Sequence, residues 1–180
     1  TFIQTRKSTL VFNEQPYQLT SKTNGSHASV SGAELAYQQL FYTRSGMWGL
    51  QANYTWTTSR ALYRTQTTTE TDNTGGIAEF YGRLEDVAKN SYNLALFYET
   101  PTLAARLNYS WRDDVLNQIG INSEVTENRA AFGSLDASLS YSLNTHFSVF
   151  AEGINLTDQA EQEFVAGNEF RSYTYYGRTF

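Results

Sequence analysis

The sequence has no cysteine, only two prolines and a single methionine among its 180 residues. The missing cysteines exclude a disulfide framework, a thiolate metal site and cysteine chemistry. Charged side chains make up 17% of the chain, below the roughly 25% of an ordinary soluble domain. The 13 basic residues are outnumbered by 18 acidic ones, and this net charge of −5 argues against a nucleic-acid-binding protein. No apolar run is long enough for a transmembrane helix.

Aromatic residues are abundant instead. They form 15% of the chain, with 13 Tyr and 11 Phe. Many aromatic residues together with few charges fit a sheet that has one apolar and one polar face. The length is that of one domain, or of a piece of something larger.

The apolar residues recur with a period of two, which predicts strands with two unlike faces. Clear alternation runs through 48–57, 91–99, 102–112 and 135–142, and weaker alternation through 33–38, 147–151 and 173–175. No segment predicts a helix. The sequence therefore predicts an all-β, antiparallel wall of about eight strands.

Three residues sit where the alternation changes phase. Phe150 and Tyr176 interrupt it and are expected to mark bulges. Gly32 is expected to mark a bulge or a close approach of two strands, because glycine weakens a strand interior. A bulge there would explain why the apolar positions shift between Ala28 and Ala33.

The connections alternate between short and long. Tight turns are predicted at 43–47, 99–101 and 143–146, and long polar connections at 62–88, 113–130 and 157–169. Most of the acidic residues fall in the long connections. Outer-membrane barrels sort their connections in this way, with short periplasmic turns and long extracellular loops.

The apolar stripes have the dimensions of a membrane wall. Trp48 and Trp56 lie on one face, eight residues apart in the sequence. At roughly 3.3 Å per residue and a tilt near 40–45°, this is about 19 Å along the membrane normal. The stripes carry no Lys, Arg, Asp or Glu, whereas Arg106 and Glu34 fall on polar faces. Outer-membrane lipid and lipopolysaccharide are therefore the expected surroundings.

Three motifs then resemble TonB-dependent outer-membrane receptors. The segment 24–35 is similar to their N-x-x-x-A-x-(V/I)-x-G-x-E-L strand, 155–158 to their N-L-T-D strand exit, and 177–180 to their G-R-T-F strand entry. The residues that match are Asn24, Ala28, Gly32, Glu34, Leu35, Asn155, Leu156, Thr157, Asp158, Gly177, Arg178, Thr179 and Phe180. All three motifs occur in order and on the predicted strands.

This resemblance implies a C-terminal portion, residues 1–180, of a roughly 22-stranded plugged barrel in the bacterial outer membrane. Such receptors import a scarce nutrient, such as a carbohydrate or a ferric siderophore, with energy delivered through TonB. The plug domain, the N-terminal strands and the TonB-binding segment are expected outside these residues. Transport is therefore expected of the whole receptor only.

The sequence offers no catalytic, cofactor-binding or metal-binding residues and no enzyme is predicted. His27 and His146 have no partner at ligand spacing. Asp113-Asp114 and the pair Glu161 and Glu163 suit a divalent cation or a bridge to lipopolysaccharide, although solvated acidic loops are the commoner case. Asn155 and Asp158 are interpreted as caps of backbone amides where a strand leaves the wall.

The lumen-facing candidates are Gln51, Asn53, Arg106 and Arg112. The two arginines share one face, where they would contact an anionic solute or carboxylates of the plug. The alternative is pairing with Glu99 or Asp136 across neighbouring strands. The residues that bind the substrate are not predicted.

Two further hypotheses remain. In the first alternative, the chain is a self-contained barrel of about eight strands with an adhesin or structural role. In the second, it is a soluble all-β ligand-binding barrel. The charge-free stripes disfavour the soluble barrel. In a self-contained barrel, Phe2–Arg6 would pair along its length with Tyr173–Phe180; in a receptor wall it would not.

Overall fold

The structure, a computed structural model, describes residues 3–69, 72–119, 126–165 and 169–180. The described residues form thirteen strands and no helix, and consequently no helix long and apolar enough to cross a membrane. The strands are β1 (Ile3–Phe12), β2 (Gln15–Asn24), β3 (His27–Thr43), β4 (Gly46–Thr69), β5 (Asp72–Gly82), β6 (Asn90–Glu99), β7 (Leu103–Arg112), β8 (Val115–Gln118), β9 (Glu127–Arg129), β10 (Phe132–Ser142), β11 (Ser148–Gly153), β12 (Glu161–Val165) and β13 (Glu169–Thr174).

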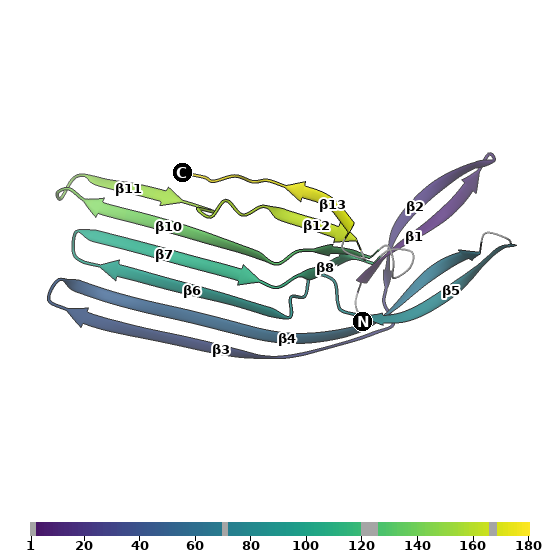
Figure 1. Ribbon diagram of the computed structural model, residues 1–180, viewed down its shortest axis with the longest axis horizontal. Coiled ribbons are helices and arrows are strands. Elements are labelled where there is room, and N and C mark those ends of the chain that lie inside the picture. The colour runs from purple at the N-terminus through teal and green to yellow at the C-terminus, as the bar shows by residue number, and fades with distance from the viewer. Residues whose placement is uncertain (1–2, 70–71, 120–125, 166–168) are drawn as a thin grey trace.

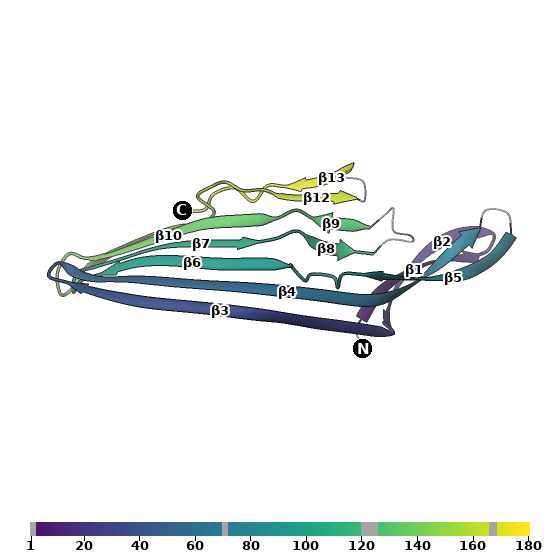
Figure 2. The same ribbon diagram turned by 60° about the horizontal axis from the view of Figure 1, so that its bottom comes forward.

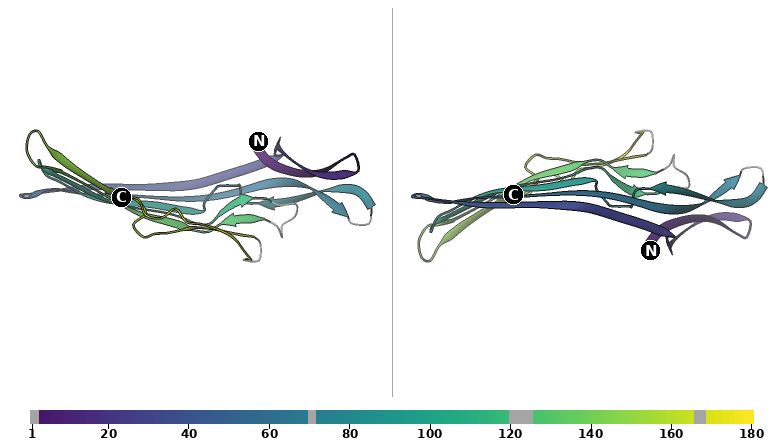
Figure 3. Two further views of the ribbon diagram at one scale, coloured as in Figure 1. Left: turned by 90° about the horizontal axis from the view of Figure 1, so that it is seen from above. Right: turned by 90° about the horizontal axis from the view of Figure 1, so that it is seen from below.

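The main sheet is an antiparallel, up-and-down wall. Its order is β11-β10-β7-β6-β4-β3, and β5 pairs with the outer part of β4 beyond β6 (Figure 1). The turns at one end are short, with two residues between β3 and β4 and three between β6 and β7. Views turned about the long axis show that the main sheet is a single layer of strands (Figures 2 and 3). The predicted fold class is confirmed.

The long connections are not irregular loops. The expected connection 62–88 contains the end of β4 and all of β5, which pair as a hairpin, while 113–130 contains β8 and β9 and 157–169 contains all of β12. The short strands β8, β9 and β12 join β13 in a second sheet of order β13-β12-β9-β8. The prediction was wrong because strands also pair through their backbones where the side chains show no regular alternation, and the sequence then gives no signal.

Continuous register carries each face of the wall from strand to strand. No shift occurs between β3 and β4, β4 and β6, β6 and β7, β7 and β10, or β10 and β11. Leu96 of β6, for example, lies opposite Leu50 of β4 and Leu107 of β7. Because side chains alternate along each strand, all the apolar stripes fall on one side, called here the apolar face, and the opposite side is the polar face.

The predicted bulge at Phe150 is wrong, and of the two alternatives for Gly32, a bulge or a close approach, the bulge is wrong. Gly32 lies in register with Thr57, and Phe150 with Ser140. A Cβ at Gly32 would lie 2.5 Å from the carbonyl oxygen of Trp56, so a close approach of two strands explains this glycine. Tyr176 lies outside the strands, where its hydroxyl group donates to Glu161 Oε2 at 3.4 Å.

Large side chains on the apolar face are exposed in this chain. Leu35 is 69% exposed, and Leu107 and Leu139 are 43% and 45% exposed. Aromatic rings border the aliphatic middle. The ring centres of Trp48 and Tyr98 lie 4.5 Å apart near the short turns, and those of Tyr92 and Trp111 lie 5.1 Å apart at the other end of the strands. A contiguous exposed apolar surface of this kind requires an apolar environment.

The buried core lies beyond this band, where the apolar side chains change face. Ala61 and Tyr63 of β4 continue the polar face, yet they are 0% and 1% exposed because Leu116 and Ile119 pack against them. Ala28 joins the cluster, which explains why its phase differs from that of Ala33. Beyond the band, the sheet thus covers large apolar residues with its own chain.

The wall is not closed among the described residues. The outer edges of the main sheet are β3 and β11. The described part of Phe2–Arg6 pairs with β2, and the strand part of Tyr173–Phe180 pairs with β12, so these two segments do not pair with each other. Beyond β13, Thr179 makes an isolated antiparallel bridge to Ile154.

The buried cluster predicts separate costs for the ring and the hydroxyl group of Tyr63. Tyr63→Ala is expected to destabilise the packing of the β4–β5 hairpin on β8 by about 3–5 kcal/mol, because a large buried ring is lost. Tyr63→Phe is expected to cost about 1 kcal/mol, because the ring stays and the 2.8 Å hydrogen bond to the Arg83 carbonyl is removed. Hydrogen exchange of the β5 and β8 amides measures both, and equal exchange in the two variants would contradict the assignment.

Candidate functional site: the polar face of the wall

The polar face presents amide and hydroxyl groups in rows across the strands. Asn53 lies opposite Asn93, which lies opposite Ser110, and the next row towards the short turns contains Gln51 and Asn108. All four candidates from the sequence, Gln51, Asn53, Arg106 and Arg112, lie on this face. A surface of neutral donors and acceptors binds water, polar solutes or a polar protein surface.

Arg106 lies near the middle of β7 and is exposed on the polar face. Its guanidinium group donates to Gln51 Oε1 at 3.3 Å and lies 5.9 Å from the centre of the Phe97 ring. The pairing with Glu99 or Asp136 considered from the sequence is absent among the described residues. Asp136 instead accepts hydrogen bonds from the Ser134 hydroxyl group and the Asn155 amide.

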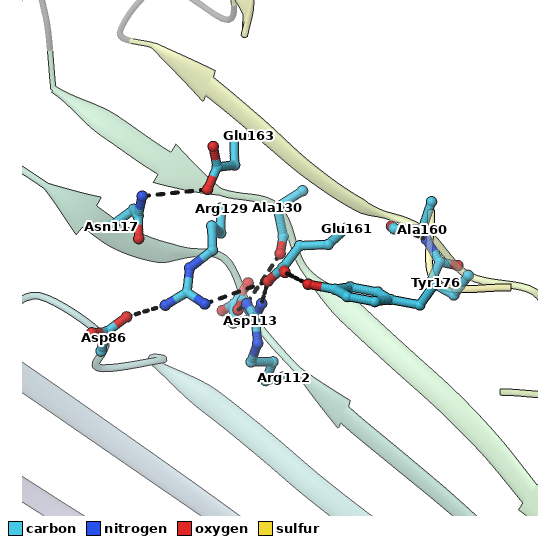
Figure 4. Close-up of polar contacts among 11 residues, drawn as sticks. Asp86, Arg112, Asp113, Asn117, Arg129, Ala130, Ala160, Glu161, Glu163 and Tyr176 are labelled. Carbon is cyan, nitrogen blue, oxygen red and sulfur yellow. Dashed lines mark hydrogen bonds and ion pairs between the residues drawn. The ribbon is translucent and has the colours of Figure 1, made fainter. Parts of the chain in front are cut away.

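Arg112 ends β7 on the side opposite the short turns, where it belongs to an ion-pair network (Figure 4). It donates to Glu161 Oε1 at 2.9 Å, and Arg129 donates to the same oxygen at 3.4 Å. Arg112 also donates to the Ala130 carbonyl at 3.1 Å. Glu161 is only 19% exposed, so two cations share one largely buried carboxylate. Sequence analysis missed this partner because 157–169 was expected to be a loop.

The network joins segments that are distant in the sequence. Arg129 also pairs with Asp86, in the connection between β5 and β6, while its Nε atom is buried without a partner. On the same strand as Glu161, Glu163 accepts hydrogen bonds from Ser172 and Asn117. Arg129 and Asp86 were not singled out in the sequence, because nothing in their immediate neighbours marks them.

The acidic pairs considered as cation sites are engaged within the chain. Asp114 pairs with Arg83 at 2.7 Å, and Asp113 accepts a hydrogen bond from Asn90 at 3.0 Å. Glu161 and Glu163 are occupied in the network described above. No group of three or more metal-ligating side chains suited to a metal ion occurs in the described ranges.

Two titratable groups adjoin the buried cluster outside the apolar band. Burial, strengthened by the nearby charge of Glu85, raises the pKa of Tyr63 to about 12. Burial also raises the pKa of Glu85, although the Ile119 amide donates to its carboxylate at 3.3 Å. Both shifts result mainly from desolvation at a packed junction.

Asn155 is the centre of the strand exit at 155–158. It is 7% exposed; its Oδ1 accepts from the Gln159 amide at 3.0 Å and its Nδ2 donates to the carbonyls of Gln159 and Gly177. Asn155 and Asp158 both have positive φ angles, of 55° and 57°. The side chain of Asn155 therefore replaces backbone partners where the chain leaves β11 and turns towards β12.

The other motif residues are dispersed along the wall. Asn24 ends β2; Ala28, Gly32, Glu34 and Leu35 lie in β3, with Glu34 on the polar face and Leu35 on the apolar face. Leu156 packs against Gly153, and Thr157 is exposed in the turn. Gly177 has a φ of 72°, Arg178 lies 3.8 Å from Asp158, Thr179 bridges to Ile154, and Phe180 is 87% exposed.

Comparison with known families gives one match. A family model described as "TonB dependent receptor-like, beta-barrel" matches residues 2–156, which span β1 to β11. Neither the curated proteins nor the solved structures yield a match.

The shared carboxylate of Glu161 leads to a prediction with an internal control. Glu161→Gln is expected to destabilise the pairing of β12 by about 2–3 kcal/mol, because Arg112 loses its carboxylate partner and Arg129 loses one of its two. Glu163→Gln, on the same strand, is expected to cost less than about 1 kcal/mol, because its partners are neutral. Hydrogen exchange of the β12 amides gives both values, and equal values would show that the network does not hold β12.

Proposed function

The chain belongs to the TonB-dependent receptor-like β-barrel family, and from this premise we propose that its main sheet is a lipid-facing section of the receptor wall. Members of this family are outer-membrane receptors of bacteria. The proposal assigns the apolar face to lipid and the polar face to the lumen of the barrel.

The exposed apolar face is the observation that carries the assignment. Between the two aromatic borders, its described residues include no Lys, Arg, Asp or Glu. Tyr and Trp at both borders suit the two membrane–water interfaces, where one end of the ring is wet. The short turns then lie towards the periplasm, and the paired hairpins and the ion-pair network lie outside the cell.

The two open edges support the assignment of residues 1–180 to the C-terminal portion of a larger barrel. Lipid offers no partner to the N–H and C=O groups of β3 and β11, so further strands must cover both edges. A closed barrel of about eight strands has room only for packed side chains in its interior. The solvated polar face, with Gln51, Asn53 and Arg106, fits the wide lumen of a roughly 22-stranded, plugged barrel better.

We further propose that the whole receptor takes up a scarce nutrient, such as a carbohydrate or a ferric siderophore, using energy delivered through TonB. The family supports active uptake. The neutral rows of Asn, Gln and Ser on the polar face are compatible with a hydrated path. The plug domain and the TonB complex are the partners that this function requires.

Neighbouring residues on β7 test which face meets lipid. Leu107→Arg in the full-length receptor is expected to cost about 2–4 kcal/mol, because it places a charge on lipid near the middle of the membrane. Asn108→Arg is expected to cost far less, because position 108 is on the polar face. Unfolding of both variants in lipid vesicles measures the difference, and equal costs would reject the assignment of the two faces.

The orientation is tested with single cysteines. Ser45→Cys lies in the short turn between β3 and β4, and Lys22→Cys lies on the outer hairpin of β1 and β2. In intact cells, an impermeant maleimide is expected to label Cys at position 22 and not at position 45. Permeabilised cells, in which both should react, provide the control. Labelling of position 45 alone in intact cells would show that the wall has the opposite orientation.

A further inference from the structure

One arginine on the side of the apolar face lies beyond the aromatic border that is remote from the short turns. Arg60 follows Trp56 by four residues on β4, and the unshifted pairing of β3 with β4 keeps both side chains on this side of the sheet. At roughly 3.3 Å per residue and a tilt near 40–45°, Arg60 lies about 10 Å beyond Trp56 along the membrane normal. Its long side chain can therefore reach the polar headgroup layer that adjoins the hydrocarbon core.

The neighbouring strands supply no carboxylate to Arg60. Its direct partner on β3 is Ser29, and the diagonal positions hold His27 and Ser31 on β3 and Tyr81 on β5. Among the described residues, the guanidinium group of Arg60 forms a ring contact and neither an ion pair nor a hydrogen bond. The charge of Arg60 is thus not balanced by this part of the chain.

The two other arginines of this region are paired. Arg64, four residues further along β4 and on the same side of the sheet, forms an ion pair with Glu79 at 2.6 Å. Arg83, which follows β5, forms one with Asp114 at 2.7 Å. Arg60 therefore differs from its neighbours in having its charge available.

Tyr81 holds the guanidinium group in place. Arg60 Cζ lies 3.9 Å from the centre of the Tyr81 ring, a distance at which a cation and an aromatic ring attract each other. The ring is itself 57% exposed. A planar guanidinium group over a ring keeps its N–H donors directed along its own edges, where an acceptor with two oxygens binds. Tyr81 is thus a positioning residue for Arg60.

Short hydroxyl side chains lie between Arg60 and the apolar band. Ser31 lies opposite Thr58, and Ser29 lies opposite Arg60; all are exposed and on the same side of the sheet. Hydroxyl groups donate to the same kind of oxygen that arginine binds. Arg60, Tyr81, Ser29, Ser31 and Thr58 are called here the headgroup patch, which contains donors and no acid and is continuous with the apolar face.

We propose that the headgroup patch binds a phosphate group of an outer-leaflet lipid whose acyl chains lie on the apolar face. This rests on the proposed function, which places that face in lipid and Arg60 on the outer side. Phosphate is the favoured anion because its oxygens match the paired donors of a guanidinium group. A lipid is favoured over a free anion because the patch and the apolar face are continuous, so that one lipid molecule contacts both.

Native mass spectrometry of the full-length receptor tests the proposal. The receptor is titrated with bisphosphorylated lipid A in detergent micelles, and the affinity for the first bound lipid is measured. Arg60→Gln is expected to weaken this affinity about tenfold, because a charge-assisted contact with two oxygens is lost. Arg64→Gln is the matched control on the same strand and side; it is expected to change the affinity less than about twofold, because Glu79 already neutralises that arginine.

A conservative variant tests the positioning role of Tyr81. Tyr81→Leu is expected to weaken lipid A binding about threefold, because the guanidinium group loses the ring that supports it. Tyr81→Phe, which keeps the ring, is expected to retain the affinity, and equal losses in both variants would contradict this role. Retained heat-modifiable mobility on gels shows that each variant barrel is folded.

Three results would overturn the proposal. Equal affinities of Arg60→Gln and the native receptor would show that Arg60 does not bind the lipid. Equally tight binding of dephosphorylated lipid A would show that phosphate is not recognised. Displacement of lipid A by inorganic phosphate at the same concentration would assign the patch to a soluble anion. If the costs at positions 107 and 108 still differ, any of these results rejects the headgroup patch alone and leaves the proposed lipid face in place.

Discussion

The structure depends on uninterrupted antiparallel register across six strands. A shift of one residue anywhere between β3 and β11 would place one stripe of aliphatic side chains on the polar face of its neighbours. Because no such shift occurs among these six strands, one side of the wall is aliphatic with aromatic borders and the other is rich in amides and hydroxyl groups. The exposed apolar face and the hydrogen-bonding polar face both follow from this alignment.

Beyond the apolar band, the same strands are stabilised by different interactions. There Leu116 and Ile119 cover Tyr63 and Ala61. This packing lies on the side of the sheet that is the polar face within the band. Ion pairs centred on Glu161 join β12 to β7 and β9. Lipid can cover a wall from outside only within the membrane, so outside it the chain must supply its own core and its own counter-charges.

The sequence predicted the elements whose two faces differ and failed where they do not. Alternation through Trp48–Thr57 and Leu103–Arg112 identified strands because one face of each is apolar. The polar strands β12 and β5 were not predicted, because their pairing depends on backbone hydrogen bonds that any side chain permits. For Gly32 the sequence left a bulge or a close approach open. The bulge was considered because the change of phase at Ala28 was visible, whereas its cause, a cluster formed with Leu116 of a distant strand, was not. The partner of Arg112 was missed for the same reason, since Glu161 comes near it only through the fold.

Arg106 and Arg112 show how depth in the wall decides what a charged residue requires. Arg112 ends β7 at the level where the chain folds back over itself, so Glu161 can reach it from β12. Arg106 lies where the wall is a single layer, and strands of a single layer present only their own alternating side chains to the interior. The register places Phe97 and Ser138 directly opposite it, and Glu99 and Asp136 at the diagonal positions. Among the described residues its guanidinium group nevertheless donates to Gln51 and lies beside the ring of Phe97, so neutral neighbours and not a carboxylate of the wall hold it in place.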